Sequence, residues 1–451
     1  MENRYRVAIV GCGVVGGATA QHLLQSEELI RTRYGLSVDL VAVADLDLTS
    51  ARRIGLPESI LTTDLDTTLS RDDVDLVVEL IGGTTTAFTV IERSLAAGKH
   101  VVTANKALLA HRGVELFAVA HRAGRDLAFE ASCCGGIPLI RSLISGLAGS
   151  RIDALYGIVN GTCNFILSEM ISKSITYDTA LAAAQEQGLA EADPTLDVSG
   201  KDSAHKIAIM ASLAFGVQID FDQIPITGID ALDLLDVTWA LRLGYVPKLL
   251  AIAERNESGV SLRVRPAFVS NRHPLAWVSG PFNAVSVYSY PTGHTMYYGR
   301  GAGGSATGGA IVADIISVAT GSYGPVFQNA GFWPDRTAPV HQNAPGEISG
   351  RYYVRAMVED RPGMLGEIAA RYGRHEISLA SVHQDETGKL SATEPSSSAA
   401  GLAVPVAIVT HHASEDNLLR AVAEINEMPR IHGECAVISI IDEPTEQLIA
   451  H

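Results

Sequence analysis

A segment in the middle of the chain, "GLAEADPTLDVSGKDSAHK" (residues 188–206), combines acidic and basic side chains at a spacing that could do chemistry. Ser199 and Asp202 have the arrangement of a helix start, and Lys206 follows one turn later, next to the apolar run "IAIMASLAFG". Burial lowers the pKa of a lysine and a nearby carboxylate raises it, which suits a proton donor or acceptor near neutral pH. Helix capping and an i,i+4 ion pair explain the same residues equally simply, so both interpretations stay open.

A glycine-rich turn near the start of the chain has the spacing of a dinucleotide-binding loop. Gly11, Gly13 and Gly16 form GxGxxG between the apolar run "YRVAIV" and a helical pattern, so the backbone can approach a pyrophosphate at a helix N-terminus. Asp45 ends the next apolar run, where its carboxylate would accept hydrogen bonds from a ribose and repel a 2′-phosphate. A tight turn and an exposed turn aspartate are the alternatives.

The elements that must position these residues form three modules. Apolar strands alternate with helical stretches up to about residue 130, which predicts a Rossmann-type, doubly wound parallel sheet in an α/β protein. Runs such as "NAVSVYSY" are typical of a half-exposed sheet. We therefore expect a dinucleotide-binding domain (1–135, with the chain returning at 303–338), an α+β substrate and dimerisation domain (136–302), a flexible linker (339–350) and a third domain (351–443).

Composition narrows the classes of function. The 451 residues are 47% hydrophobic and carry a net charge of −16 without a Lys/Arg tract, so we expect no nucleic-acid partner. The first apolar run is too short for a signal peptide or a membrane span, so no membrane partner is expected. Five cysteines, with Cys133 and Cys134 adjacent, indicate neither a disulfide framework nor a CxxC metal pair. We expect a cytoplasmic enzyme with reduced cysteines.

Several stretches resemble the homoserine dehydrogenase family. The resemblance extends from residue 1 to about 335, and it rests on "AQEQGLAEADPTLDVSGKDSAHK", "VVTANKALLA", "FEASCCGGIP", "NGTCNFIL", "HPLA" and "YYGRGAGG". It implies hydride exchange between a nicotinamide cofactor and C4 of L-aspartate 4-semialdehyde, giving L-homoserine for threonine and methionine biosynthesis. Lys206 and Lys106 match the pair that moves the proton of the C4 oxygen, with Lys206 the favoured acid. Glu191 and Asp202 match the residues that grip the substrate ammonium, and further substrate binding is expected at Asp197 and Thr162.

The same resemblance implies sites for a cofactor and a metal ion. Contacts to NAD or NADP are expected at Gly11, Gly13, Val14, Val15, Gly16, Asp45, Gly82, Lys106, Gly188, Glu191 and Gly303. A sodium ion near the hinge is expected on Glu130 and the carbonyls of Cys133, Gly135 and Ile137, oxygen ligands that suit a hard cation. Relatives that prefer NADP commonly carry a basic residue just before the Asp45 position, whereas Ala44 stands here. We therefore expect a preference for NAD, with Arg52 and Arg53 as the residues that could reverse it.

The C-terminal stretch "YYVRAMVEDRPGMLGEIAARYGRHEISLASVHQ" (352–384) resembles an ACT domain, a βαββαβ ligand-sensing fold. Asp360, Pro362 and Gly363 in its "DRPGMLGEIA" turn are the most specific part of this resemblance. It implies an amino-acid effector, with threonine expected, and pairing into a homodimer or homotetramer. A module that only dimerises is the alternative, and the Ser/Ala-rich loop at 386–401 departs from a compact version.

Two other functions fit parts of the sequence. Cys133 or Cys134 could act as the nucleophile of a Cys-dependent aspartate-semialdehyde dehydrogenase, although no histidine partner can be named. A non-enzymatic amino-acid sensor built on a dehydrogenase scaffold is the second alternative. The intact set of Lys106, Asp202 and Lys206 argues against the sensor.

Overall fold

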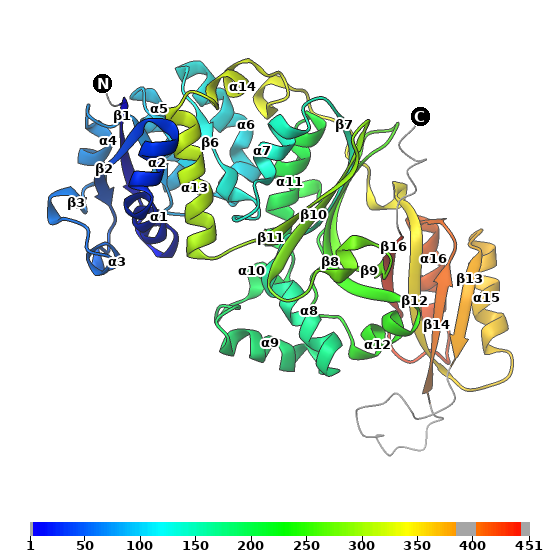
Figure 1. Ribbon diagram of the computed structural model, residues 1–451. Helices are drawn as coiled ribbons and strands as arrows, with labels where there is room; N and C mark the ends of the chain where they lie inside the picture. Colours follow the sequence, from blue (N-terminus) through cyan, green and yellow to red (C-terminus); the bar gives the residue numbers. More distant parts are fainter. Residues whose placement is uncertain (1–2, 385–402, 443–451) are drawn as a thin grey trace.

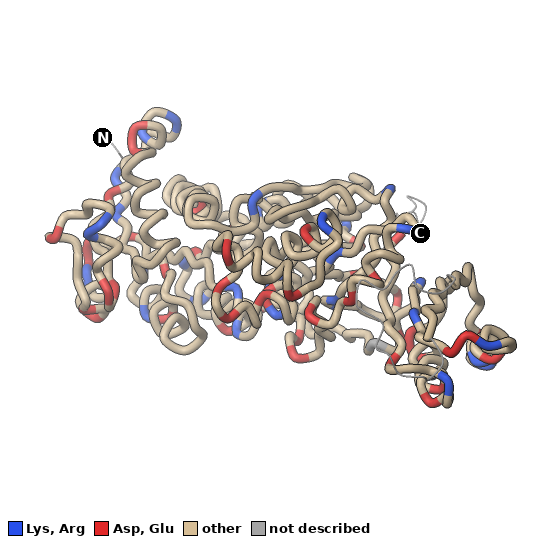
Figure 2. Tube along the Cα trace, turned by 90° about the horizontal axis from the view of Figure 1, so that it is seen from below, with Lys and Arg blue, Asp and Glu red and all other residues tan. Residues whose placement is uncertain are grey.

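The computed structural model of the protein describes residues 3–384 and 403–442. Figure 1 shows three regions in a row, with a parallel sheet at the N-terminal end, an antiparallel sheet in the middle and the C-terminal elements at the far end. Acidic and basic residues are interspersed along the chain from one end of the molecule to the other (Figure 2). In the described ranges no single helix is long and apolar enough to cross a membrane, and one bent pair, 304–319 with 324–336, passes by length and composition.

The first sheet has six parallel strands, and its central strands contain short apolar runs that are buried on both faces. In spatial order they are β3 (Leu61–Thr62), β2 (Leu36–Ala44), β1 (Asn3–Val10), β4 (Leu76–Glu79), β5 (His100–Thr103) and β6 (Leu127–Ala128). The helices between them are α1 (Val14–Gln25), α2 (Glu27–Tyr34), α3 (Thr49–Arg53), α4 (Leu65–Ser70), α5 (Thr86–Ala96) and α6 (Lys106–Ala123). The order 3-2-1-4-5-6 is that of a doubly wound dinucleotide-binding sheet, which confirms the predicted fold class.

The chain returns to this first region through α13 (Gly304–Ala319), which lies beside α1 in Figure 1. A Cβ added to Gly308 would lie 3.1 Å from the backbone nitrogen of Thr19, so glycine lets the two helices approach closely. The next helix, α14 (Gly324–Asn329), begins shortly after the end of α13.

The middle region is an antiparallel sheet with helices against it. Its strands run in the order β11 (Gly293–Arg300), β10 (Phe282–Tyr290), β7 (Arg151–Ile158), β8 (Tyr245–Arg255) and β9 (Val260–Ser270). Its helices are α7 (Leu139–Arg141), α8 (Gly161–Lys173), α9 (Tyr177–Glu186), α10 (Thr195–Val198), α11 (Lys201–Phe215) and α12 (Leu234–Arg242). Every residue of α11 from Asp202 to Leu213 is buried, as expected for a helix that is apolar on nearly all sides.

The C-terminal region extends the middle sheet. Its elements are β12 (Ser349–Glu359), α15 (Met364–Arg374), β13 (Leu379–Gln384), β14 (Ala403–Thr410), β15 (Ala413–Ser414), α16 (Glu415–Asn426) and β16 (Ala436–Ile441). Strand β16 pairs in parallel with β9, so the sheet continues as β9-β16-β12-β14-β13. The Ser/Ala-rich loop expected at 386–401 lies outside the described residues.

The segment 339–350 is not the free tether that its composition suggested. His341 accepts a hydrogen bond from the Val260 amide at 3.0 Å, and the Asn343 amide donates to the Val260 carbonyl at 2.8 Å. The segment therefore adds backbone pairing along the start of β9. Proline, glycine and polar residues indicated a linker, but such residues also occur in ordered segments that pair with an edge.

Candidate active site

Two lysines from different helices share one buried carboxylate. Lys106 is the first residue of α6, just beyond the carboxyl end of β5, and its Nζ lies 2.6 Å from Oδ1 of Asp202. Lys206 lies one turn after Asp202 on α11, and its Nζ donates to Asp202 Oδ2 at 2.7 Å and to the Val159 carbonyl at 2.6 Å. The Lys106 side chain is 34% exposed and that of Lys206 is 8% exposed, so Lys106 faces the open side of this cluster.

The charges of the cluster stabilise one another. Burial opposes a charge on Asp202, but the two lysines outweigh it and hold the pKa of the carboxyl well below its ordinary value. Burial likewise acts to lower the pKa of Lys206, and Asp202 outweighs it, so the pKa lies above that of an ordinary lysine. The sequence had indicated a lysine poised near neutral pH. The structure instead holds Lys206 as a charged ammonium, because its Nζ contacts the Asp202 carboxylate.

Asn160 connects this cluster to a second carboxylate. Its Nδ2 donates to Asp202 Oδ2 at 2.9 Å and to Asp197 Oδ1 at 2.7 Å, while its Oδ1 accepts from the Cys163 amide and caps α8. Sequence reasoning used "NGTCNFIL" only for its resemblance and did not single out this residue. The signal was present, because Asn is a preferred N-cap residue and stands directly before a helical run.

The other expected substrate residues lie around this cluster at different depths. Thr162 donates through Oγ1 to the Leu189 carbonyl at 2.8 Å, which ties the start of α8 to the loop after α9. Glu191 lies exposed in that loop, and no hydrogen bond or ion pair of its carboxylate occurs within the described part of the chain. The structure thus brings Lys106, Asp202, Lys206 and, through Asn160, Asp197 together, and among the described residues Glu191 makes no hydrogen bond or ion pair with them through its carboxylate.

The glycine loop after β1 fits a dinucleotide. A Cβ added to Gly11 would lie 2.7 Å from the carbonyl carbon of Leu80, and a Cβ added to Gly16 would lie 2.0 Å from the carbonyl oxygen of Gly11. The protein's own packing therefore requires glycine at both positions. At Gly13 an added Cβ would meet no protein atom within 4 Å, and φ is −70°, which any residue adopts. Neither packing nor conformation explains Gly13, so its lack of a side chain points to a ligand approaching the N-terminus of α1.

Two of the remaining cofactor candidates, Asp45 and Gly82, lie at the carboxyl ends of strands of the parallel sheet, and the others lie at helix starts or in a loop. Asp45 accepts hydrogen bonds from the amides of Cys12 and Asp47 at the end of β2. Gly82 follows β4 with a φ of +73°, and Asn105, the N-cap of α6, donates to the adjacent Gly83 carbonyl at 2.7 Å. Val14 and Val15 are the first residues of α1. Gly303 is the N-cap of α13, and the next residue, Gly304, packs near the Val14 carbonyl. Gly188 lies in the loop after α9 with a φ of +69°.

The expected sodium ligands lie on the turn between β6 and α7. Both Glu130 oxygens accept backbone amides, from Ile140 at 2.8 Å and from Arg141 at 2.9 Å. The Ile137 carbonyl accepts the Leu139 amide, while the described residues make no hydrogen bond to the carbonyls of Cys133 or Gly135. Across the described ranges no group of three His, Cys, Asp or Glu residues could hold a metal ion. Main-chain oxygens beside one carboxylate fit a hard monovalent cation in type.

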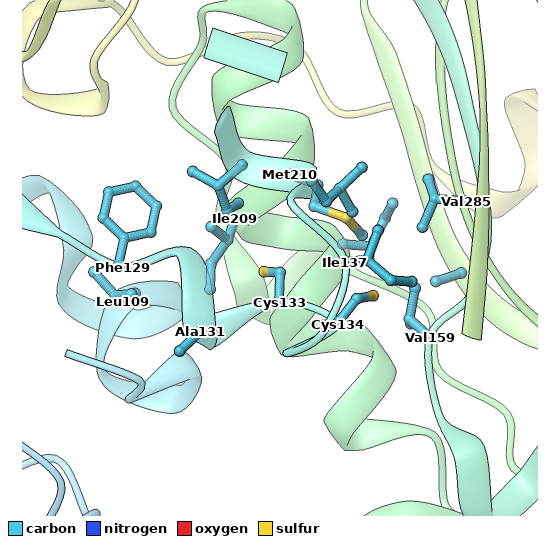
Figure 3. Close-up of a cluster of buried hydrophobic side chains, with 14 of the residues drawn as sticks. Leu109, Phe129, Ala131, Cys133, Cys134, Ile137, Val159, Ile209, Met210 and Val285 are labelled. Atoms are coloured by element: carbon cyan, nitrogen blue, oxygen red, sulfur yellow. The ribbon is translucent and has the colours of Figure 1, made fainter. Parts of the chain in front are cut away.

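Figure 3 shows the side chains of Cys133 and Cys134 among apolar residues that include Ile137, Val159 and Met210. Burial raises the pKa of both thiols, which disfavours the thiolate that a nucleophile needs. The geometry therefore favours the lysine cluster over either cysteine as the reacting centre.

Comparison with known proteins shows which family the chain resembles. The family model "Homoserine dehydrogenase, NAD binding domain" matches residues 11–130, and "Homoserine dehydrogenase" matches residues 138–316. The homoserine dehydrogenase of Neisseria gonorrhoeae is 39% identical over 440 residues, which cover 96% of this chain and 97% of that protein. The corresponding protein of Bacillus subtilis is 36% identical over 429 residues, covering 94% and 95%.

Solved structures give the same result. A crystal structure of a homoserine dehydrogenase from Thiobacillus denitrificans has 38% sequence identity and a TM-score of 0.89, covering 97% of this chain and 98% of that one. A putative homoserine dehydrogenase from Archaeoglobus fulgidus is 32% identical with a TM-score of 0.63, and it covers 70% of this chain and 99% of its own. Two family models and relatives that match over nearly the whole length lead to one conclusion: the chain belongs to the homoserine dehydrogenase family.

Proposed function

We propose that Lys106, Asp202 and Lys206 form the proton-transfer centre of this oxidoreductase in the interconversion of L-aspartate 4-semialdehyde and L-homoserine. One observation carries the proposal, namely a buried carboxylate with a lysine Nζ at 2.6 Å from one oxygen and a second at 2.7 Å from the other. The cluster begins where β5 ends, at the edge of the sheet that also carries the glycine loop, and ligands of doubly wound sheets bind at this edge.

A nicotinamide cofactor would supply or accept the hydride at C4, held at Gly11, Gly13 and Gly16. In the reducing direction Lys206 donates a proton to the C4 oxygen as that carbon gains the hydride, and in the oxidising direction its neutral amine takes the proton back. Asp202 keeps Lys206 protonated before the reaction. Lys106, on the open side of the cluster, holds the same oxygen and can serve as the second proton carrier.

The substrate ammonium would be bound by carboxylates next to the cluster. Both Asp202 oxygens already contact lysines, whereas Asp197 is half-buried and has one oxygen bonded to Asn160. Glu191 stands exposed on a loop that Thr162 ties to α8 through the Leu189 carbonyl. We assign Asp197 and Glu191 to the ammonium and Asp202 chiefly to the lysines.

Preference for NAD over NADP is supported by the charges around the second strand. The Asp45 carboxylate beside the glycine loop would accept bonds from ribose hydroxyls and repel a 2′-phosphate. Arg52, one of the two residues that could hold such a phosphate, is paired with Glu58 at 2.8 Å. Initial rates with L-homoserine and either cofactor test both parts of the proposal. Absence of turnover with both would refute the activity, and a higher kcat/KM with NADP would refute only the cofactor choice.

The C-terminal region is proposed to be an ACT domain that senses threonine and pairs with a second copy, as the element order β12-α15-β13-β14-α16-β16 supports. Regulation requires that threonine bind the active and inactive states unequally. The test uses the full chain, measuring rate and melting temperature with and without threonine. No change in either would leave the region as an assembly or packing module. The sodium site on Glu130 and the cytoplasmic location stay predictions, and rates in sodium against potassium salts test the former.

A further inference from the structure

A single amide side chain lies between the lysine cluster and the neighbouring carboxylate. We propose that Asn160 is a positioning residue of the active site, which orients Asp202 toward both lysines and holds Asp197 beside it. This inference rests on the proposed function, because it assumes that the cluster moves the proton.

The orientation of the Asn160 amide is determined from both ends. Its Oδ1 accepts the Cys163 amide at 2.8 Å, so its Nδ2 must face the other way. Both Nδ2 hydrogens are then used, one on Asp197 at 2.7 Å and one on Asp202 at 2.9 Å. Asn160 is 5% exposed, so water does not compete for these bonds.

The residue before Asn160 binds the same lysine that Asp202 binds. The Val159 carbonyl accepts from Lys206 Nζ at 2.6 Å, while Asn160 and Lys206 share Asp202 Oδ2. The short connection between β7 and α8 therefore contacts both members of the ion pair: the Val159 carbonyl binds Lys206, and the Asn160 side-chain amide binds Asp202. Without the amide, two carboxylates would face each other, and repulsion would turn Asp202 away from Lys206. Because burial alone lowers the pKa of a lysine, a displaced Asp202 leaves Lys206 a weaker base.

Asn164, one turn later on α8, offers a matched control. It is 1% exposed, and its Nδ2 donates to the carbonyls of Val278, Gly280 and Phe282 at 3.3, 2.9 and 3.1 Å. Truncating either asparagine removes a buried amide from the same helix. Only Asn160 contacts the carboxylates, so a purely structural role predicts the same kinetic outcome for both.

The experiment compares Asn160→Ser, Asn160→Ala and Asn164→Ala in the full-length enzyme. Serine keeps the helix cap but is too short to reach both carboxylates, so Asn160→Ser separates positioning from folding if the alanine variant is unstable. We expect Asn160→Ser to lose roughly 10- to 100-fold in kcat/KM, as misplaced catalytic groups do. The alkaline limb of its pH profile for aldehyde reduction should move to lower pH. Asn164→Ala should lower the melting temperature and keep the wild-type pH profile.

A wild-type pH profile and kcat/KM for Asn160→Ser would overturn the inference, and so would an equal shift of the profile in Asn164→Ala. Lys206→Ala, measured in parallel, distinguishes a failure of the positioning role of Asn160 from a failure of the proposed proton-transfer centre. If Lys206→Ala is nearly inactive while Asn160→Ser is normal, only the positioning role fails. If Lys206→Ala turns over normally, the proposed proton-transfer centre itself fails.

Discussion

Asp202 and Asp236 are both buried carboxylates with cationic partners, and their surroundings differ in an instructive way. Asp202 contacts two lysines, one of them 34% exposed, beside the cofactor edge of the sheet. Asp236 on α12 contacts Arg355 of β12 through two bonds of 2.6 and 2.8 Å, and it accepts the Tyr353 hydroxyl at 3.0 Å. The first site has an excess of cations that can release protons, and the second has a cation that cannot.

This difference separates chemistry from architecture. Burial acts to lower the pKa of Arg355, but Asp236 outweighs it and raises the pKa further, so no proton is available in the working range. The guanidinium fork binds the carboxylate in a fixed geometry and joins the C-terminal region to α12 of the middle region. A lysine carries a single ammonium that can give up its proton to a substrate oxygen. Buried ion pairs therefore point to catalysis when the cation is a lysine near an open edge.

The largest expected effect comes from removing the proton donor at the first site. Lys206→Ala should lower kcat by roughly 10²- to 10⁴-fold, the usual contribution of a general acid. Lys206→Arg should do the same, because the charge stays but the proton is no longer available. Lys201→Ala, an exposed lysine at the start of the same helix, is the control and should retain wild-type kcat. Steady-state kinetics with circular dichroism checks this, and activity in Lys206→Arg would contradict the distinction between the two sites.

The second site should respond in the opposite manner. Arg355→Ala leaves Asp236 buried without a cation and should cost about 3–5 kcal/mol in the free energy of unfolding, measured by denaturant titration. The kcat of the molecules that remain folded should change little. The double variant Asp236→Leu with Arg355→Met should recover much of the loss, because an apolar pair of similar volume needs no counter-charge. A large drop in kcat with normal stability would show that the junction acts on the site.

The sequence predicted the first site far better than the second. The glycine spacing, the strand rhythm and the segment around Asp202 are local patterns, so they could be recognised without a structure. The contact between Asp236 and Arg355 joins residues that are far apart in the chain, so no local sequence pattern predicts it. The same holds for the pairing of β16 with β9, which turned an expected tethered domain into a continuation of the sheet.

At the first site too, the sequence did not reveal the surroundings of every residue, as Asn160 and Glu191 show. The sequence analysis did not single out Asn160, and only the fold brings Asp197 and Asp202 to its amide nitrogen. Glu191 lies exposed on a loop, and its expected role in substrate binding stays a prediction. Because β16 pairs with β9 and Arg355 pairs with Asp236, deleting residues 340–451 would uncover a sheet edge and leave Asp236 without its cation, so an insoluble product is expected.

Acid should affect the first site more than the second through His205, which precedes Lys206 on α11. Burial, and then the neighbouring His111, lower the pKa of His205 to about 4, while Asp202 acts in the opposite direction and Lys106 and Lys206 add to the lowering. The unfolded chain binds this proton near pH 6.5 and the folded chain does not, so stability falls between about pH 6.5 and 4. The slope from this residue should be about 1.4 kcal/mol per pH unit. His205→Asn should flatten unfolding free energies measured over this range, and an unchanged slope would assign the effect to other groups such as His273, whose pKa is also lowered to about 4.

The smallest expected effect tests whether the second site depends on the shape of its cation or only on its charge. Arg355→Lys keeps a positive charge against Asp236 but replaces two fixed bonds with one mobile ammonium. Arg355 is 9% exposed, so water compensates poorly for the lost bond, and a cost of about 1–2 kcal/mol in unfolding free energy is expected, close to that of one charged hydrogen bond. Activity should stay at the wild-type level, because residue 355 contacts Asp236 and none of the residues Lys106, Asp202 and Lys206. If Arg355→Lys proved as unstable as Arg355→Ala, bidentate geometry would account for the whole contribution of the junction, and charge neutralisation for almost none of it.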